Sequence, residues 1–212
     1  MRLKHIKGSE EYVEKSDYVI HEPETYFNKW NEVFSNNNPI HVEIGMGRGD
    51  FVIGMALKHP EINFIGVELY DSVIYKALKK IEELNKKIDN LRILREDAFN
   101  IDKFFNHEVS RIYLNFSDPW PKARHEKRRL TSEQFLNKYD AVFKVSKEIF
   151  QKTDNDDLFA YSIQSLEKHG YVLKNVTTDL YKNMIEDNVP TEYEMKFASK
   201  GKNINRLEAY KS

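Results

Sequence analysis

The sequence predicts an α/β fold built on a mostly parallel sheet of seven strands. Apolar runs rich in β-branched and aromatic residues alternate with amphipathic stretches along most of the 212 residues. A glycine-rich loop follows the first strand of this alternating series, and four of the predicted strands lead into an acidic residue. Because strands and helices that alternate wind into a parallel sheet, the four acids would meet at one sheet edge, where such folds bind ligands.

Seven segments have the composition of strands and end at turn-forming or polar residues. They cover residues 40–44, 63–68, 91–94, 109–116, 148–151, 171–177 and 205–210. Apolar residues at three- and four-residue spacing predict helices between these strands. The predicted helices cover residues 26–34, 50–57, 71–85 and 157–169, together with one that begins near 131, where Thr131 to Gln134 has the pattern of a capping box.

Residues 25–212 contain no repeat, linker or low-complexity tract and are predicted to form one domain. Residues 1–24 are polar and mixed in charge, and we interpret them as an N-terminal arm. This arm is either an ordinary surface extension or a second basic patch for a polyanion, formed by Arg2, Lys4, His5 and Lys7.

Composition excludes several classes of chemistry. The chain has no cysteine, so disulfides, thiolate nucleophiles and cysteine-ligated zinc are ruled out. No His-Glu-x-x-His pattern occurs, and a metal site is not expected. No apolar run approaches the roughly 20 residues of a membrane helix, and the N-terminus lacks the features of an export signal. The expected protein is cytoplasmic, with no membrane association.

The acids at the ends of the first four predicted strands are Glu43, Glu68, Asp97 and Asp118. Each alone could cap a helix, but together at one edge they indicate a cationic or neutral ligand with ribose hydroxyl groups. Gly45 and Gly47 lie in a G-x-G-x-G loop, so the G-x-G-x-x-G dinucleotide fingerprint is not met. An oxidoreductase with a nucleotide cofactor and a triphosphate-binding protein are therefore both disfavoured.

Residues 111–130 form the most distinctive stretch. A predicted strand leads into Ser117-Asp118-Pro119-Trp120-Pro121, and the two prolines prevent the strand from continuing. A dense basic segment follows after Lys122, and its members are Arg124, His125, Glu126, Lys127, Arg128 and Arg129. This segment is either a solvated face or a contact for RNA phosphates, which its charge density favours. Trp120 either stacks on a base or packs in the core.

On the stretches HVEIGMGRGDF, YLNFSDPWPKARHEKRRLT, KTDN and TEYE, the chain resembles the bacterial tRNA (guanine-N7)-methyltransferases along nearly its full length. The resemblance implies a Rossmann-like class I methyltransferase fold with helices on both faces of the sheet. It also implies S-adenosyl-L-methionine as the cofactor, tRNA as the partner and N7 of a variable-loop guanine as the methyl acceptor. Family members act as a monomer or a homodimer.

The resemblance assigns positions to three sites. The cofactor site comprises the glycine loop and the strand-end acids, namely Glu43, Gly45, Gly47, Glu68, Asp97 and Asp118. The substrate site comprises Lys122, Asp154, Thr191, Glu192, Tyr193 and Glu194, and the RNA-contacting segment is 124–129. Asp118 is expected to be catalytic through positioning of the base. Thr191 and Glu194 also have the spacing of a capping box, which is compatible with a ligand contact.

Two other functions fit the same sequence. The stretch 117–121 is similar in kind to the proline-rich tetrapeptide motifs of enzymes that methylate amino groups. Another RNA base or an exocyclic amine is therefore an alternative target. A non-catalytic tRNA-binding protein would share the basic segment, but it would not need four acids at successive strand ends. A methyltransferase should bind S-adenosylmethionine, whereas a protein that only binds tRNA should not, so a titration with this cofactor distinguishes the two functions.

Overall fold

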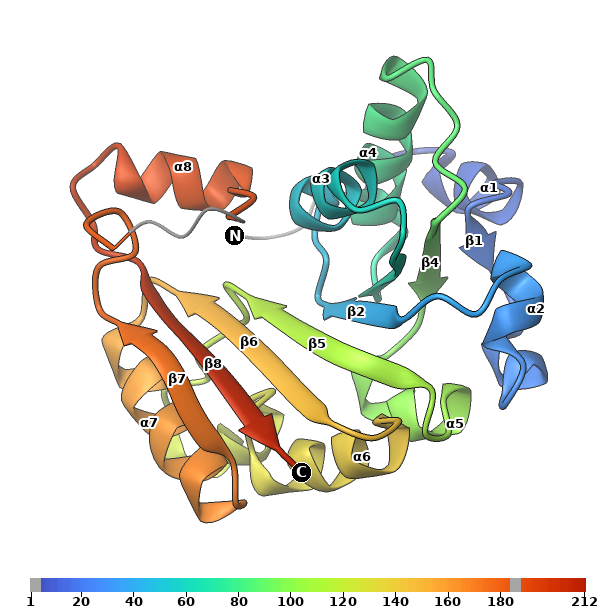
Figure 1. Ribbon diagram of the computed structural model, residues 1–212. Coiled ribbons are helices and arrows are strands. Elements are labelled where there is room, and N and C mark those ends of the chain that lie inside the picture. The colour runs from blue at the N-terminus through green and yellow to red at the C-terminus, as the bar shows by residue number, and fades with distance from the viewer. Residues whose placement is uncertain (1–4, 184–187) are drawn as a thin grey trace.

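The computed structural model describes residues 5–183 and 188–212, which fold around one sheet with helices on both faces (Figure 1). Its eight strands in the described residues are β1 (Val19–Ile20), β2 (Ile40–Ile44), β3 (Asn63–Glu68), β4 (Leu91–Arg95), β5 (Val109–Asn115), β6 (Lys147–Thr153), β7 (Val172–Thr177) and β8 (Asn205–Lys211). They lie in the order β1-β4-β3-β2-β5-β6-β8-β7. The first six strands in this order are parallel, and β8 is antiparallel to both of its neighbours.

All seven predicted strands are present, and β1 adds an eighth at the sheet edge beside β4. It comes from the segment that we interpreted as an arm, of which residues 1–4 lie outside the described part of the chain. Helix α1 (Ser9–Glu14) precedes β1 and packs on α4 (Asp71–Glu83), with Val13 fully buried and the Tyr12 ring 4.9 Å from that of Tyr75. A two-residue strand is too short to show a periodic pattern, which is why the sequence did not reveal it.

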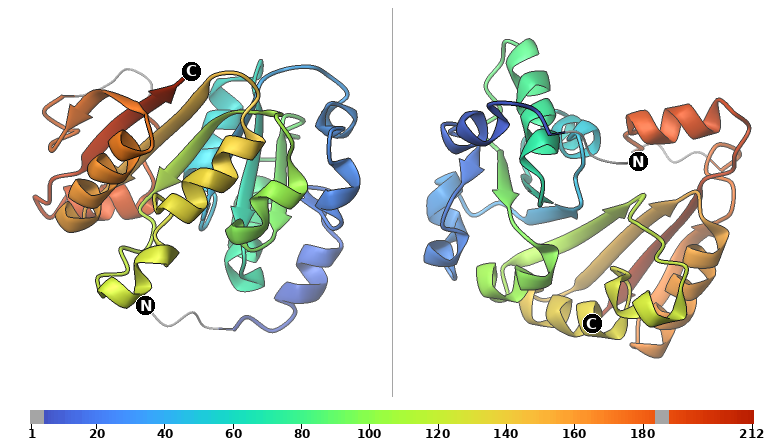
Figure 2. Two further views of the ribbon diagram at one scale, coloured as in Figure 1. Left: turned by 90° about the horizontal axis from the view of Figure 1, so that it is seen from below. Right: turned by 180° about the vertical axis from the view of Figure 1, so that it is seen from behind.

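The helices divide between the two faces of the sheet. Helices α1, α3 (Asp50–Lys58) and α4 cover one face, whereas α5 (Ile101–Phe104), α6 (Glu133–Val142) and α7 (Asp156–Lys168) cover the other (Figures 1 and 2). Because strand side chains alternate between faces, Phe64 joins the apolar core beneath α3 and α4 while Ile65 joins the core beneath α5 and α6. Both faces of the central strands are therefore buried, as in other parallel sheets.

Two local predictions were wrong. The helix expected over residues 26–34 is replaced by the short turn η1 (Pro23–Tyr26) and helix α2 (Trp30–Phe34), separated by Asn28 with a φ of 64°. The distant Glu108 carboxylate stabilises this break, since it accepts from the backbone N–H groups of Asn28 (3.1 Å) and Trp30 (3.2 Å). The capping box before α6 does not form, because the Thr131 hydroxyl bonds with Ser162 and the Gln134 side chain donates to the Lys127 carbonyl.

The remaining elements lie close to the carboxyl ends of the parallel strands. The short helical turns η2 (Ala98–Asn100) and η3 (Ala123–Arg128) follow β4 and β5. Between β7 and β8 the chain returns to the same edge as α8 (Glu192–Ala198), which Figure 1 shows across from α3. In the described residues, no helix is long and apolar enough to span a membrane. The fold thus gathers four strand ends, two turns and one late helix at one edge.

Candidate active site

A cavity of about 600 Å³ lies at the carboxyl ends of β2, β3, β4 and β5. All six residues expected at the cofactor site line it: Glu43, Gly45, Gly47, Glu68, Asp97 and Asp118. The first turn of α8 contributes Thr191, Glu192 and Tyr193 to the same cavity, and the loop after β5 contributes Trp120. Residues that are up to 150 positions apart in the chain therefore surround one space.

The glycine loop between β2 and α3 follows a path that only glycine adopts easily. Gly45 and Gly47 have φ values of 73° and 55°, in the left-handed region. A Cβ atom at either position would meet nothing within 4 Å, so backbone conformation rather than crowding requires glycine here. Gly66 on β3 has the opposite reason, since its Cβ would lie 2.3 Å from the Met46 sulfur. Gly66 was not among the predicted site residues, although a glycine inside a strand is a signal of close packing.

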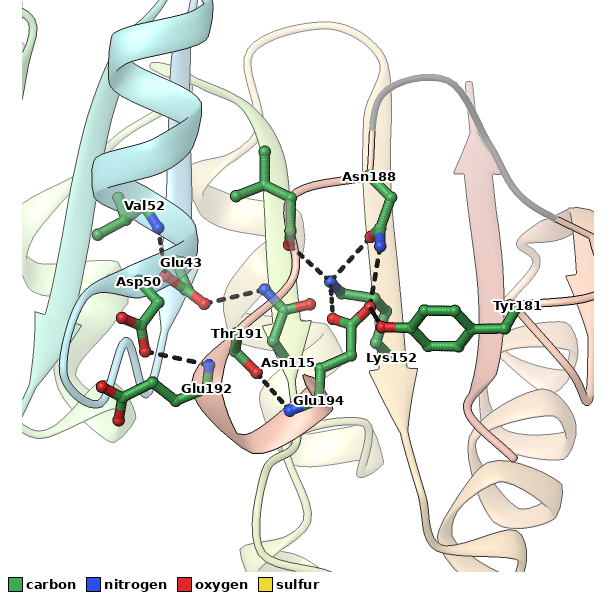
Figure 3. Close-up of polar contacts among 11 residues, drawn as sticks. Glu43, Asp50, Val52, Asn115, Lys152, Tyr181, Asn188, Thr191, Glu192 and Glu194 are labelled. Atoms are coloured by element: carbon green, nitrogen blue, oxygen red, sulfur yellow. Dashed lines mark hydrogen bonds and ion pairs between the residues drawn. The ribbon is translucent and has the colours of Figure 1, made fainter. Parts of the chain in front are cut away.

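Glu43 is buried, with 3% of its surface exposed. One carboxylate oxygen accepts from the Asn115 side-chain amide (2.9 Å), and the other accepts from the Val52 backbone N–H (3.1 Å) (Figure 3). Burial raises the pKa of Glu43 to about 8, so the side chain is protonated at neutral pH. Glu43 therefore links the ends of β2 and β5 to the start of α3, and both of its oxygens already have partners within the protein.

Glu68 and Asp97 present carboxylate oxygens to the cavity. Glu68 accepts from three backbone N–H groups, those of Gly47 (3.2 Å), Leu69 (2.9 Å) and Tyr70 (3.3 Å). Burial raises its pKa, and the nearby negative charge of Asp118 adds to the shift. Asp97 caps η2 through Oδ1, which accepts from Phe99 (2.8 Å). Since a carboxylate oxygen has two lone pairs, both side chains keep capacity for further donors.

Asp118 lies in a loop that leaves β5 through an unusual backbone path. Phe116 and Trp120 have φ values of 54° and 42°, positions in the left-handed region on either side of Asp118. The Arg129 guanidinium donates twice to the Trp120 carbonyl, at 3.3 and 3.1 Å, and the Arg128 guanidinium lies 4.8 Å above the Trp120 ring. Asp118 itself is exposed, without a hydrogen bond from the part of the chain that the structure describes. The loop is thus braced while its carboxylate is available.

The basic segment divides into two groups. Arg124 and Lys127 are exposed, as is Lys122 just before the segment, whereas Arg129 is half-buried against the Tyr161 ring, 4.2 Å from its centroid. The sequence had treated all of these cations alike. Those that face solvent are suited to contact a polyanion, and Arg129 instead supports the Asp118 loop.

Like Arg128, two further members of this segment contact the protein. The His125 ring meets the Trp120 ring edge-on at 5.7 Å, and Glu126 accepts from the Tyr161 hydroxyl at 3.0 Å. These contacts hold η3 against both the loop and α7. Lys122 does not line the cavity, although the resemblance placed it at the substrate site.

The predicted cap at Thr191 is present, because the Thr191 hydroxyl accepts from the Glu194 backbone N–H at 2.9 Å. The reciprocal half of the capping box is missing. The Glu194 side chain is fully buried and accepts from Lys152 (2.6 Å), Asn188 (2.9 Å) and the Tyr181 hydroxyl (3.3 Å). It does not line the cavity, so the structure separates Glu194 from the other three residues of this turn.

Polar contacts also tie Glu192 and Tyr193 to other elements. Glu192 accepts from Arg48 of the glycine loop (2.9 Å) and from Lys80 of α4 (3.1 Å), which draws the start of α8 toward both. The Tyr193 hydroxyl donates to Asp154 at 3.5 Å, and Lys202 donates to the same carboxylate at 2.7 Å. Asp154 thereby lies behind Tyr193 and outside the cavity lining. In the described ranges, no group of three His, Asp or Glu side chains could hold a metal ion.

Comparison with known proteins identifies the family of this chain. The family described as "Putative methyltransferase" matches residues 37–207. Two proteins named tRNA (guanine-N(7)-)-methyltransferase, from Lachnoclostridium phytofermentans and Lysinibacillus sphaericus, are each 51% identical to this chain. The alignments cover 100% and 99% of this chain, and 99% and 97% of the respective relatives.

Solved structures agree on the fold alone. An antibiotic-related methyltransferase has a TM-score of 0.63 at 14% identity, covering 87% of this chain and 92% of that protein. The 16S rRNA (adenine(1408)-N(1))-methyltransferase of Catenulisporales acidiphilia has a TM-score of 0.58 at 14% identity, covering 86% of this chain and 91% of that protein. Since the identity to the full-length relatives is far higher, those relatives decide the family. The chain belongs to the tRNA (guanine-N(7)-)-methyltransferase family.

Proposed function

We propose that this protein transfers a methyl group from S-adenosyl-L-methionine to N7 of a guanine in the variable loop of tRNA. The observation that carries the proposal is the cavity at the strand ends, where the glycine loop, the strand-end carboxylates and the exposed Asp118 meet beside a basic segment. The names of the full-length relatives support the same reaction on tRNA.

The residues in the cavity fit the cofactor. Glu68 and Asp97 offer carboxylate oxygens that suit ribose hydroxyls, and the open space beside Gly45 and Gly47 lets a ligand approach the backbone. A cavity edge rich in carboxylates also favours a cationic ligand. When bound, S-adenosylmethionine supplies an electrophilic methyl group on a sulfonium centre. Glu43 would act on this site indirectly, because its oxygens hold Asn115 and α3.

Guanine N7 carries a lone pair and is an acceptor on the exposed edge of the base, so it needs no prior loss of a proton. The protein must instead fix the base in line with the methyl group, which is worth up to roughly 7–11 kcal/mol when geometry is well fixed. The Asp118 carboxylate can accept from the guanine N1–H and exocyclic amine. It would also stabilise the positive charge that develops on the base. We assign Asp118 this positioning and electrostatic role, not acid–base catalysis.

The exposed cations around this loop give the proposal its tRNA-binding surface. Arg124 and Lys127 face solvent on η3, close to the Asp118 loop that Arg129 holds. Phosphate contacts from such cations orient a nucleic acid without reading its sequence. Thr191 and Tyr193, which line the far wall of the cavity, are suited to contact the edge or face of the target base.

Incubation with unmodified tRNA and methyl-labelled S-adenosylmethionine, followed by digestion to nucleosides, tests the proposal. We expect the label in 7-methylguanosine. A matched tRNA whose variable-loop guanine is replaced by adenine should remain unlabelled. Label in a different nucleoside, or in both tRNAs equally, would contradict the proposed target.

A further inference from the structure

We infer that Lys152 is a positioning residue for this reaction: it holds the first turn of α8 in place as a wall of the cofactor cavity. The inference rests on the proposed function, because it concerns the same cavity. Lys152 lies near the end of β6, and neither its side chain nor that of Glu194 lines the cavity. Its influence on the cavity therefore passes through the segment that it binds.

Lys152 uses all of its hydrogen-bonding capacity on one short segment. Its ammonium group donates to the Asn188 side chain (3.1 Å), the Val189 carbonyl (3.1 Å) and the Glu194 carboxylate (2.6 Å) (Figure 3). An ammonium group has three donors, and the three acceptors lie within residues 188–194. With 4% exposure for Lys152 and none for Glu194, water cannot readily replace these contacts. One side chain on the sheet thus binds three groups of the segment 188–194, which leads into α8.

The held segment carries the cavity wall. Thr191 caps α8 through the Glu194 N–H, so fixing the Glu194 side chain also fixes the turn between them. That turn presents Thr191, Glu192 and Tyr193 to the cavity. Glu192 makes the other ion pairs of this turn, to Arg48 and Lys80, but it is 49% exposed. Exposed pairs of this kind contribute little, so the Lys152 contacts are the buried ionic restraint on this turn, alongside the bond from the Glu192 backbone N–H to Asp50 (3.3 Å).

Gly54 on α3 provides a second, uncharged contact with the same segment. A Cβ atom at this position would lie 2.6 Å from a methyl carbon of Val189. The segment therefore packs on α3 only because residue 54 has no side chain. Lys152 and Gly54 hold Val189 by different forces, through its carbonyl and its side chain. Either residue can be changed to displace the segment without touching the cavity.

A buried ion pair is weak evidence of a role in stability, because desolvation of the two charges offsets their attraction. A positioning role makes a sharper prediction. Lys152→Met should weaken binding of S-adenosylhomocysteine at least tenfold by isothermal titration calorimetry, and in turnover it should raise KM for the cofactor more than it lowers kcat. Gly54→Ala should weaken binding in the same direction. Because alanine favours helix over glycine, it should do so with no loss of helix content by circular dichroism.

Arg206→Met is the matched control. Arg206 is a buried cation on β8, directly opposite Lys152 in the strand register, and its side chain pairs with Glu208. Its loss should change cofactor affinity no more than about twofold, even where it lowers the thermal midpoint as much as Lys152→Met does.

The outcomes separate the inference from the proposed function. Wild-type affinity in both Lys152→Met and Gly54→Ala would overturn the inference while methylation by the wild type stands. If Lys152→Met does not fold, Gly54→Ala still tests whether the position of this segment sets cofactor affinity, and wild-type affinity in that variant overturns the inference. A wild-type protein that binds neither S-adenosylhomocysteine nor S-adenosylmethionine would instead refute the proposed function. If Arg206→Met loses as much cofactor affinity as Lys152→Met, the effect of Lys152 is one of general structure, and the inference is also overturned.

Discussion

Replacing Glu43 by glutamine should remove a pH dependence of stability that this side chain imposes on the wild-type protein. Burial raises the pKa of Glu43 from its usual value of 4.5 to about 8, so the folded state keeps a proton that the unfolded state releases. Between these two values, stability falls as pH rises, because the unfolded chain binds fewer protons. The contribution of protonated Glu43 to the free energy of unfolding is fully present below pH 4.5 and is lost as pH rises through 8.

The size of the effect follows from the shift. Each pH unit between the two pKa values costs about 1.4 kcal/mol, so the wild type should lose about 4 kcal/mol relative to Glu43→Gln between pH 5 and pH 8. Glutamine matches the shape of the protonated acid. It can still accept from Val52 and, after rotation of the Asn115 amide, donate to that side chain. The variant should therefore match the wild type at pH 5 and exceed it at pH 8.

Urea denaturation followed by circular dichroism, repeated from pH 5 to pH 9, measures this difference. Glu133→Gln is the control, since it makes the same chemical change at an exposed position in the first turn of α6 and so removes a carboxylate without altering a buried site. If the Glu43→Gln and wild-type curves run parallel, Glu43 is ionised in the folded protein. The reasoning from burial would then be wrong.

Three further substitutions test the division of labour around the Asp118 loop. Asp118→Asn should lower kcat by at least tenfold while tRNA affinity, measured by fluorescence anisotropy, stays within about threefold; an equal fall in affinity would contradict a positioning role. Arg124→Ala combined with Lys127→Ala should weaken tRNA binding and reduce the slope of log affinity against log salt by roughly 1.4–1.8, with cofactor affinity unchanged. An unchanged slope would exclude these cations from phosphate contact. Arg129→Met should instead lower turnover with little change in that slope, because Arg129 holds the Trp120 carbonyl. A salt slope that falls as in the double variant would place Arg129 on the RNA.

The central sheet could be predicted because its signals are local. The strands β2 to β5 are rich in apolar residues and mostly buried, and each ends at or leads into an acid that the parallel topology brings to one edge. The four acids therefore required no knowledge of tertiary contacts beyond strand direction. The two-residue β1 had no such signal, and its place in the sheet depends on backbone pairing with β4.

Capping motifs were less reliable, because their side chains can find distant partners. Thr131 and Thr191 both begin a capping pattern, yet only Thr191 caps its helix. The Thr131 hydroxyl meets Ser162 at 2.8 Å, and the Glu194 carboxylate, expected to complete the second box, pairs with Lys152, 42 residues away. The competing partners come from α7 and β6, which sequence spacing alone does not reveal.

Composition predicted the charge of the basic segment but not how its cations divide. Arg129 reaches the Trp120 carbonyl because Trp120 adopts a positive φ, and it packs on Tyr161 because α7 lies beneath η3. Neither the positive φ of Trp120 nor the position of α7 can be predicted from the spacing of residues in the sequence. The prediction from the sequence therefore counted more cations as available to RNA than the structure leaves exposed. Arg124 and Lys127 are the better residues with which to test phosphate contact.

The protonation of Glu43 also bears on the positioning role of Lys152. Lys152 lies among two buried carboxyl groups, and its positive charge lowers the pKa of Glu43 against the larger effect of burial. While Glu43 is neutral, the buried carboxylate that pairs with Lys152 is that of Glu194. Lys152→Met should therefore raise the pKa of Glu43 further. The stability of the Lys152→Met protein can be compared with that of the double variant that also carries Glu43→Gln. The pH at which this difference in stability stops changing should be higher than it is for the same comparison in the wild-type background. An unchanged midpoint would show that Lys152 and Glu43 do not share an electrostatic environment.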